Sequence, residues 1–270
     1  MSDPIQCFRW TSKLYGSQFQ LSVHAYFVDG LLIDTGPGKL QEQVLPDLMP
    51  LPIEQIFLTH HHEDHTGNLA VLHATQPNIP VYAHPTCAKI MKNPPKVSLA
   101  EKLIWGKHTP FQDIQPVGAT LDTFKYSFQP IYTPGHAIDH LALYEPQEGW
   151  LFTGDLYVHP YISYFVANEC LATQINSLKK LIALDFDRML CSHSLEQQNG
   201  KALLQQKLQF FQTFSGRVLH WHRQGYTPKQ IMRKMKFKEK WLVNILSGGW
   251  LSALNMVKSV IRAERLGLWD

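Results

Sequence analysis

Residues 57–67 read FLTHHHEDHTG and place four histidines and two acids in six consecutive positions, directly after an apolar run. The alternating spacing of His60, His62 and Asp64 fits a loop that leaves a strand, because ligands on one helix face recur every three or four residues. Imidazole and carboxylate groups without a thiolate suit Zn²⁺, Mn²⁺ or Fe²⁺. Together with His65 the cluster predicts a metal site, and a solvated histidine-rich loop is the alternative.

Three further side chains that can bind metal stand where strands are expected to end. His136 follows a Pro-Gly turn in YTPGH, Asp155 follows an apolar run in WLFTGD, and His193 follows another in RMLCSH. Any one of them alone would more often be an ordinary surface or core residue. The repetition of strand, small residues and ligand favours one site assembled from several strand ends.

The segments that must position these side chains alternate between strand and helix signals. Two β-rich runs flank Asp29-Gly30, a strong signal for a two-residue hairpin. Strand patterns then recur at 53–60, 79–84, 123–136, 140–155 and 188–193. Helical patterns occupy 66–74, 86–108 around Pro94-Pro95, and 170–185. Strands followed by helices, twice over and without a long βαβ rhythm, predict two packed sheets covered by helices.

Charge divides the chain near Gly200. Residues 1–200 contain 12 Lys/Arg and 19 Asp/Glu, a net charge of −7, whereas residues 201–270 contain 13 Lys/Arg and three acids, a net charge of +10. The second part has helical patterns throughout, with Thr227-Pro228 as a helix start. We therefore expect a catalytic domain over 1–200 and a basic helical region over 201–270.

Neither export nor membrane insertion is expected. The first ten residues, MSDPIQCFRW, lack the basic start and apolar core of a secretory signal, and the four cysteines are far apart, which favours free thiols in the cytoplasm. The uncharged segment 241–257 is shorter than the roughly 20 apolar residues that a membrane span needs and contains several polar residues. It is interpreted as a packed helix.

The motifs DGLLIDTG, THHHEDHTG, TPGH, TGD and SH, in this order over residues 20–195, resemble the metallo-β-lactamase superfamily of hydrolases. The resemblance implies an α/β sandwich of αβ/βα layers, here followed by a C-terminal helical extension, with a dinuclear metal site at one edge. It implies a buried aspartate, Asp34, that supports the ligand loop. The ligands it implies are His60, His62 and His136 for one metal, Asp64, His65 and His193 for the other, and Asp155 bridging both.

This resemblance, closest in pattern to the hydroxyacylglutathione hydrolase and lactonase-like branch, implies a hydrolase. Two divalent metal ions per chain are expected, most often zinc in such sites, although the ligands also suit iron and manganese. A hydroxide shared by the metals would cleave a thioester, lactone or related carbonyl ester, with Asp64 as a catalytic residue that orients or shuttles the proton. His62 matters, because an acid there would suit the oxygen-reducing diiron branch instead. The serine-nucleophile motif GxSxG is absent.

The substrate is less well defined by sequence. The segment after Asp155 is rich in rings, and Tyr157, His159 and Tyr161 are predicted to line the rim and contact a small-molecule substrate, with simple packing of a long loop as the alternative. The basic residues that would contact glutathione have no match in this chain. His61 and Glu63 are expected to point outward, and His24 to be structural or exposed.

The basic tail keeps other functions open. Its helices suit docking on the acidic body or a homodimer, and less well an anionic substrate such as a coenzyme A or glutathione conjugate. Nucleic acid is the less favoured partner, and a metal-dependent nuclease or phosphodiesterase is the alternative function. A metal-binding module without turnover is the non-enzymatic alternative.

Overall fold

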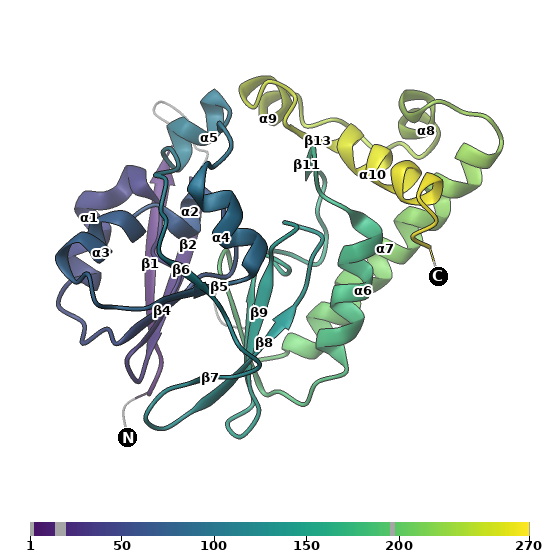
Figure 1. Cartoon of the computed structure of the whole chain (residues 1–270). Coiled ribbons are helices and arrows are strands. Elements are labelled where there is room, and N and C mark those ends of the chain that lie inside the picture. Colours follow the sequence, from purple (N-terminus) through teal and green to yellow (C-terminus); the bar gives the residue numbers. More distant parts are fainter. Residues whose placement is uncertain (1–2, 14–19, 195–197, 270) are drawn as a thin grey trace.

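The computed structural model describes residues 3–13, 20–194 and 198–269. Two β-sheets face each other, and helices cover the outer side of each (Figure 1). The predicted αβ/βα sandwich with a C-terminal helical extension is therefore confirmed.

The first sheet has six strands in chain order. Its first three strands are antiparallel, and the last four are joined by parallel pairings with helices in between. No long βαβ rhythm was predicted, because the strands concerned have only three residues each, which is too short for a clear sequence pattern. The strands are β1 (Gln6–Lys13), β2 (Gln20–Val28), β3 (Leu31–Ile33), β4 (Gln55–Phe57), β5 (Val81–Ala83) and β6 (Ile114–Pro116).

The helices between these strands are short. They pack on the outer face of the first sheet or lie at the edge that carries the histidine cluster (Figure 1). They are η1 (Gly38–Leu40), α1 (Gln41–Leu48), α2 (Glu63–Thr66), α3 (Leu69–Thr75), α4 (Pro85–Lys92) and α5 (Leu99–Ile104).

The second sheet has the order β12-β10-β9-β8-β7. Strands β10 and β12 are parallel, and α6 (Leu171–Ile182) crosses between them. A two-stranded ribbon pairs β11 (Phe165–Val166) with β13 (Leu251–Ser252) and so ties the loop after β10 to the C-terminal region. The five strands are β7 (Leu121–Asp122), β8 (Ser127–Tyr132), β9 (Leu141–Glu145), β10 (Trp150–Gly154) and β12 (Arg188–Cys191).

Alternating side chains fill the space between the two sheets. In β3, Leu31 and Ile33 face the other sheet, while Leu32 faces the outer helices. In β10, Phe152 faces the first sheet and Leu151 faces the helices. This period of two is what a strand buried on both faces requires.

The predicted hairpin at Asp29-Gly30 is confirmed between β2 and β3. Both residues have positive φ, 46° and 83°, as a type I′ turn requires. A second turn, at Glu148-Gly149, joins β9 to β10, and Gly149 has a φ of 67°.

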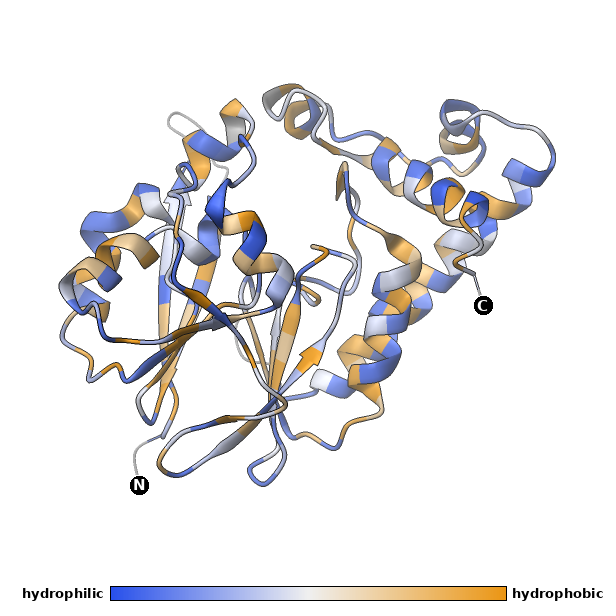
Figure 2. Ribbon diagram, viewed as in Figure 1, coloured by the Kyte–Doolittle hydropathy of each residue, from blue (hydrophilic) through white to orange (hydrophobic). Residues whose placement is uncertain are grey.

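The C-terminal region consists of α7 (Gly200–Arg223), α8 (Pro228–Lys234), α9 (Trp241–Leu246) and α10 (Ala253–Arg265). Helices α7 and α10 are amphipathic, as the mixed colouring in Figure 2 shows, and their apolar sides share a core with α6 and β12. The start of α8 is the predicted one, with Thr227 and Gln230 forming a capping box. Because α7 shares this core, the domain boundary at residue 200 stays a prediction.

The interpretation of 241–257 as one packed helix is wrong. Helix α9 ends at Leu246, Gly248 and Gly249 follow with positive φ, and strand β13 separates α9 from α10. Trp241, Leu242 and Ile245 are largely exposed, so a homodimer through these helices stays a prediction. No helix in the described ranges is both long and apolar enough to cross a bilayer.

Candidate metal centre

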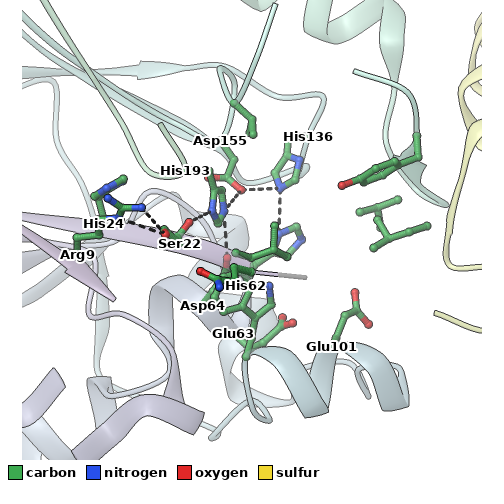
Figure 3. Close-up of a pocket in the computed structure, with 17 residues that line it drawn as sticks. Arg9, Ser22, His24, His62, Glu63, Asp64, Glu101, His136, Asp155 and His193 are labelled. Carbon is green, nitrogen blue, oxygen red and sulfur yellow. Dashed lines mark hydrogen bonds and ion pairs between the residues drawn. The ribbon is translucent and has the colours of Figure 1, made fainter. Parts of the chain in front are cut away.

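The ends of four strands meet at one edge of the sandwich and bring the predicted ligands together. His60 and His62 lie in the turn after β4, and Asp64 and His65 lie in α2, which begins at Glu63. Figure 3 shows His136 and His193 on either side of Asp155, with His62 and Asp64 opposite. His136 follows β8, Asp155 follows β10 and His193 follows β12.

The first group consists of three imidazoles. His60 Nε2 and His136 Nε2 each lie 3.0 Å from His62 Nδ1. Burial, and then the charge of neighbouring histidines, lowers the pKa of His60 and His62 well below the usual value. Burial also lowers the pKa of His136, but the Glu169 carboxylate outweighs it and raises this pKa. The three nitrogens lie together and can hold a cation once His136 gives up its proton.

The second group combines two carboxylates with two imidazoles, Asp64, Asp155, His65 and His193. His193 Nε2 lies 3.1 Å from Asp64 Oδ2 and 3.2 Å from Asp155 Oδ2. Burial lowers the pKa of His193, but Asp155 and Asp64 outweigh it and raise this pKa to about 10. The carboxylates therefore attract positive charge to this position.

Asp155 lies between the two groups. Its Oδ2 atom is 3.4 Å from His136 Nε2, and its Oδ1 atom is 3.3 Å from His65 Nε2. Burial alone would raise the pKa of Asp155, but His193 and His65 lower it well below its usual range. The carboxylate is thus ionised and faces ligands from both groups.

Two buried atoms here have no hydrogen-bond partner within the described part of the chain, His65 Nε2 and Asp155 Oδ1. An unpaired buried polar atom destabilises a fold by about 1–3 kcal/mol. Both atoms point to the other candidate ligands, so a cation would satisfy them. The donor set of nitrogen and carboxylate oxygen fits zinc, iron or manganese.

Asp34 supports the ligand loop from behind, in line with the role that the resemblance implies for it. Its Oδ2 atom accepts from His65 Nδ1 at 2.7 Å and from the Thr59 hydroxyl at 2.9 Å, and Oδ1 accepts the Thr59 N–H at 2.8 Å. The first bond leaves His65 Nε2 unprotonated when a cation binds there. Asp34 adopts a φ of 62°, which the surrounding hydrogen bonds stabilise.

His140 also supports the site, although it was not among the residues predicted from the sequence. His140 Nε2 accepts the backbone N–H of Asp155 at 3.0 Å, and its Nδ1 donates to the Thr133 hydroxyl at 2.8 Å. Burial lowers the pKa of His140 to about 3, so it stays neutral. Gly154 is required beside it, because a Cβ there would lie 2.6 Å from His140 Nε2.

The other ligand histidines also have partners behind them. His193 Nδ1 donates to the Ser22 carbonyl at 2.7 Å, and His136 Nδ1 lies 3.6 Å from the Glu169 carboxylate. Such partners fix the orientation of a ligand ring. These two partners were not predictable from the sequence, because both contacts join distant segments.

The expectation that His61 and Glu63 point outward is wrong. Both are buried, at 6% and 5% exposure. His61 Nδ1 pairs with Asp139 at 2.8 Å, and Glu63 lies 3.7 Å from His108 Nε2. Burial, and then the charge of Asp64, raises the pKa of Glu63 well above its usual value, so its carboxyl can stay neutral in the interior.

We expect His61→Ala to lower the free energy of unfolding by about 3 kcal/mol, because it leaves Asp139 buried without its partner. Metal content should stay near that of the wild type, since the His61 ring pairs with Asp139 and belongs to neither group of candidate ligands. Urea unfolding and elemental analysis measure the two effects. The double variant with Asp139→Ala should regain part of the stability, and loss of metal in His61→Ala would contradict this placement.

A cavity of about 400 Å³ opens on the ligands. Arg9, His24 and Glu101 line it, together with Trp105 at the end of α5 (Figure 3 labels the first three). His24 is buried, and its Nδ1 donates to the Ser192 carbonyl at 3.0 Å, which agrees with a structural role.

The expectation that Tyr157 lies on the rim is wrong. It is 2% exposed and packs in the core beside α7, because the chain turns inward directly after Asp155. His159 and Tyr161 instead line a second cavity, of about 300 Å³, that shares His136 and Asp155 with the first. Their contact with substrate stays a prediction.

Comparison with known proteins gives a matching protein family and several relatives named as hydrolases. Residues 19–193 match the model of the metallo-beta-lactamase superfamily. The thioesterase pkgB of Emericella nidulans is 36% identical over 130 residues, which cover 46% of this chain and 32% of the relative. A hydroxyacylglutathione hydrolase of Idiomarina loihiensis is 30% identical over 171 residues, covering 63% and 58%. The matched region thus spans about a third of the thioesterase and somewhat more than half of the hydroxyacylglutathione hydrolase.

A solved structure extends the similarity to the C-terminal helices. A metallo-beta-lactamase family protein from Thermus thermophilus aligns with a TM-score of 0.67 and 17% identity, covering 97% of this chain and 94% of that one. At this identity the likeness shows the fold alone. The match of the family model over more than half of the sequence shows that the chain belongs to the metallo-beta-lactamase superfamily.

Proposed function

We propose that this protein is a metal-dependent hydrolase of a thioester or a related carbonyl ester. The observation that carries the proposal is the meeting of two sets of ligand atoms around one carboxylate, that of Asp155, at the floor of a cavity. One set is all imidazole, and the other contains carboxylates as well, an arrangement suited to two divalent cations.

In this proposal His60, His62 and His136 would hold one cation, and Asp64, His65 and His193 would hold the other, with the Asp155 carboxylate facing both groups. Divalent cations at such a site polarise a carbonyl oxygen and lower the pKa of water towards 7. Zinc fits the ligands, as do iron and manganese. Asp64 faces the cavity and has a second carboxylate oxygen, so we assign it the task of orienting water and accepting its proton.

The cavity and the relatives favour a carbonyl substrate. Beside the charged groups, the walls include the apolar side chains of Leu21, Trp105, Val158 and Leu251, which suit an acyl or thiol portion. The relatives named as a thioesterase and as a hydroxyacylglutathione hydrolase support thioester cleavage.

A groove in the C-terminal region supports a second candidate, hydrolysis of a phosphodiester in nucleic acid. Lys229, Arg233, Lys236 and Lys238 line this groove together with Trp241. Cations with an exposed ring are what single-stranded nucleic acid would contact. The groove does not share residues with the metal centre, which makes this candidate the weaker one.

We expect a panel of thioesters, lactones and phosphodiesters to show carbonyl ester turnover well above phosphodiester turnover. Removal of metal with a chelator should abolish turnover, and adding Zn²⁺, Mn²⁺ or Fe²⁺ should restore it. Elemental analysis of protein purified without chelator should give about two ions per chain.

Nuclease activity that falls steeply with salt, with no turnover of any carbonyl ester, would overturn the proposal in favour of the second candidate. Metal content near zero that does not rise on adding these ions would contradict both.

A further inference from the structure

The second cavity joins the metal centre to helix α7 of the C-terminal region. His136 and Asp155 form its inner end, and Lys207 of α7 lines it with Glu169 and Gln174. The inferred hydrolysis does not use Lys207. A lysine from a helix about 50 residues after Asp155 thus lines a cavity that begins at the candidate ligands.

Lys207 is only 1% exposed, which is rare for a lysine. Its ammonium group donates to the Leu156 carbonyl at 2.6 Å and lies over the rings of Tyr157 and Phe211, at 6.0 and 5.3 Å from their centres. An ammonium has three N–H donors, and the carbonyl of Leu156 is the one hydrogen-bond acceptor found for it among the described residues.

Burial has the largest effect on the pKa of Lys207, and the charges of Glu169 and Asp155 act against it. Glu169 accepts from the Val166 N–H at 2.8 Å and from Gln174 Nε2 at 2.6 Å, and its other neighbour is His136. Within the described ranges, no acid forms an ion pair with Lys207. Burial lowers the pKa of Lys207 to about 8, so it still carries its proton at neutral pH.

We propose that Lys207 binds a carboxylate on the acyl part of the substrate, so that this hydrolase prefers carboxyacyl thioesters. This inference rests on the proposed function and adds the chemical class of the acyl group. A buried ammonium with open donors on a cavity wall is suited to an anionic oxygen, and a charged hydrogen bond there is stronger than a neutral one.

We assign the acyl part of the substrate, and not the thiol part, to the second cavity because of the size and position of that cavity. The first cavity is larger and reaches the exposed Gln20 at the surface, so it can accommodate a thiol carrier that is bulkier than the acyl group. The second cavity also reaches the surface, beside the exposed His159 and Tyr161, but it is the smaller one, and the buried side chains of Lys207 and Gln174 form part of its wall.

The test compares glutaryl and butyryl thioesters of the same thiol, assayed with wild-type protein, Lys207→Met and Lys201→Met. Methionine keeps the length of the side chain without its charge, and Lys201 is the matched lysine on the same helix, outside both cavities. We expect the wild type and Lys201→Met to favour the glutaryl ester in kcat/KM by about tenfold or more. Lys207→Met should lower that ratio by about tenfold.

A glutaryl-to-butyryl ratio that Lys207→Met leaves unchanged would overturn the proposal, and an equal fall for both esters would then show a purely structural lysine. Repeating the pair on glutathione and on N-acetylcysteamine separates the two parts of the substrate. If the fall in kcat/KM of Lys207→Met depends on which thiol is used and not on which acyl group, the assignment of the acyl part to this cavity would also be overturned.

Calorimetric binding of glutarate and butyrate to the metal-loaded protein separates this inference from the proposed function. Glutarate should bind more tightly than butyrate, and Lys207→Met should remove most of the difference. If no thioester is hydrolysed but this binding result holds, the proposed function fails and the anion site stands. Equal binding of glutarate by wild type and Lys207→Met would overturn the anion site.

Discussion

Asp155→Ala is expected to empty both metal positions and to lower kcat/KM for a thioester by about 10³-fold or more. The Asp155 carboxylate faces His136 of one group and His65 and His193 of the other, at 3.2–3.4 Å. Without it, two cations would share no anionic ligand and would repel each other across the site. Elemental analysis, and turnover at saturating added metal, measure the two losses.

Asp113→Ala provides the control, because Asp113 is an exposed acid outside the cavities that contain the candidate ligands. It should keep wild-type metal content and turnover. Retention of two tightly bound ions in Asp155→Ala would show that the carboxylate does not bridge, whereas loss of one ion alone would assign it to a single position.

Asp34→Asn is expected to lower the free energy of unfolding by about 3–5 kcal/mol and metal affinity by about 10- to 100-fold. Asn keeps the size of the side chain and tolerates the φ of 62°, so the effect reports the lost charge together with the lost acceptor oxygen. The amide offers one acceptor oxygen where the carboxylate offers two to Thr59 and His65. Urea unfolding of metal-free protein and titration with Zn²⁺ measure the two quantities.

Asp29→Asn is the matched control, since Asp29 also has a positive φ, of 46°, and accepts one backbone hydrogen bond, from Lys125. Asp29 lies in the hairpin before β3, at the opposite end of that strand from Asp34. We expect Asp29→Asn to change the free energy of unfolding by less than about 1 kcal/mol. Equal losses in the two variants would mean that the backbone conformation, and not the contact with His65, accounts for the effect.

The candidate ligands were accessible to sequence reasoning because each lies within a few residues of a strand end. The spacing of His60, His62, Asp64 and His65 is local, and each of the other three candidates follows a strand of the second sheet. The hairpin at Asp29-Gly30 was predictable for a similar reason, because its positive φ values depend on the residues in the turn itself.

Contacts between distant segments were not accessible in this way. His61 and His62 are neighbours in the same motif, yet His61 is buried because Asp139, 78 residues away, lies beside it. Tyr157 was predicted to lie at the rim because its segment is rich in aromatic residues, but its side chain is buried in the core beside α7. Glycines and a short strand divided 241–257, where an uncharged run had indicated one helix.

The family, most of the strands and helices, and the candidate metal ligands were predictable from the amino-acid sequence, since all of these depend on local spacing. Which side chains contact the ligands from behind, and which residues line the second cavity, follow only from the packing of distant segments. Asp139, His140, Glu169 and Lys207 acquire their partners only on packing, when burial makes every polar group depend on the segments that fold against it.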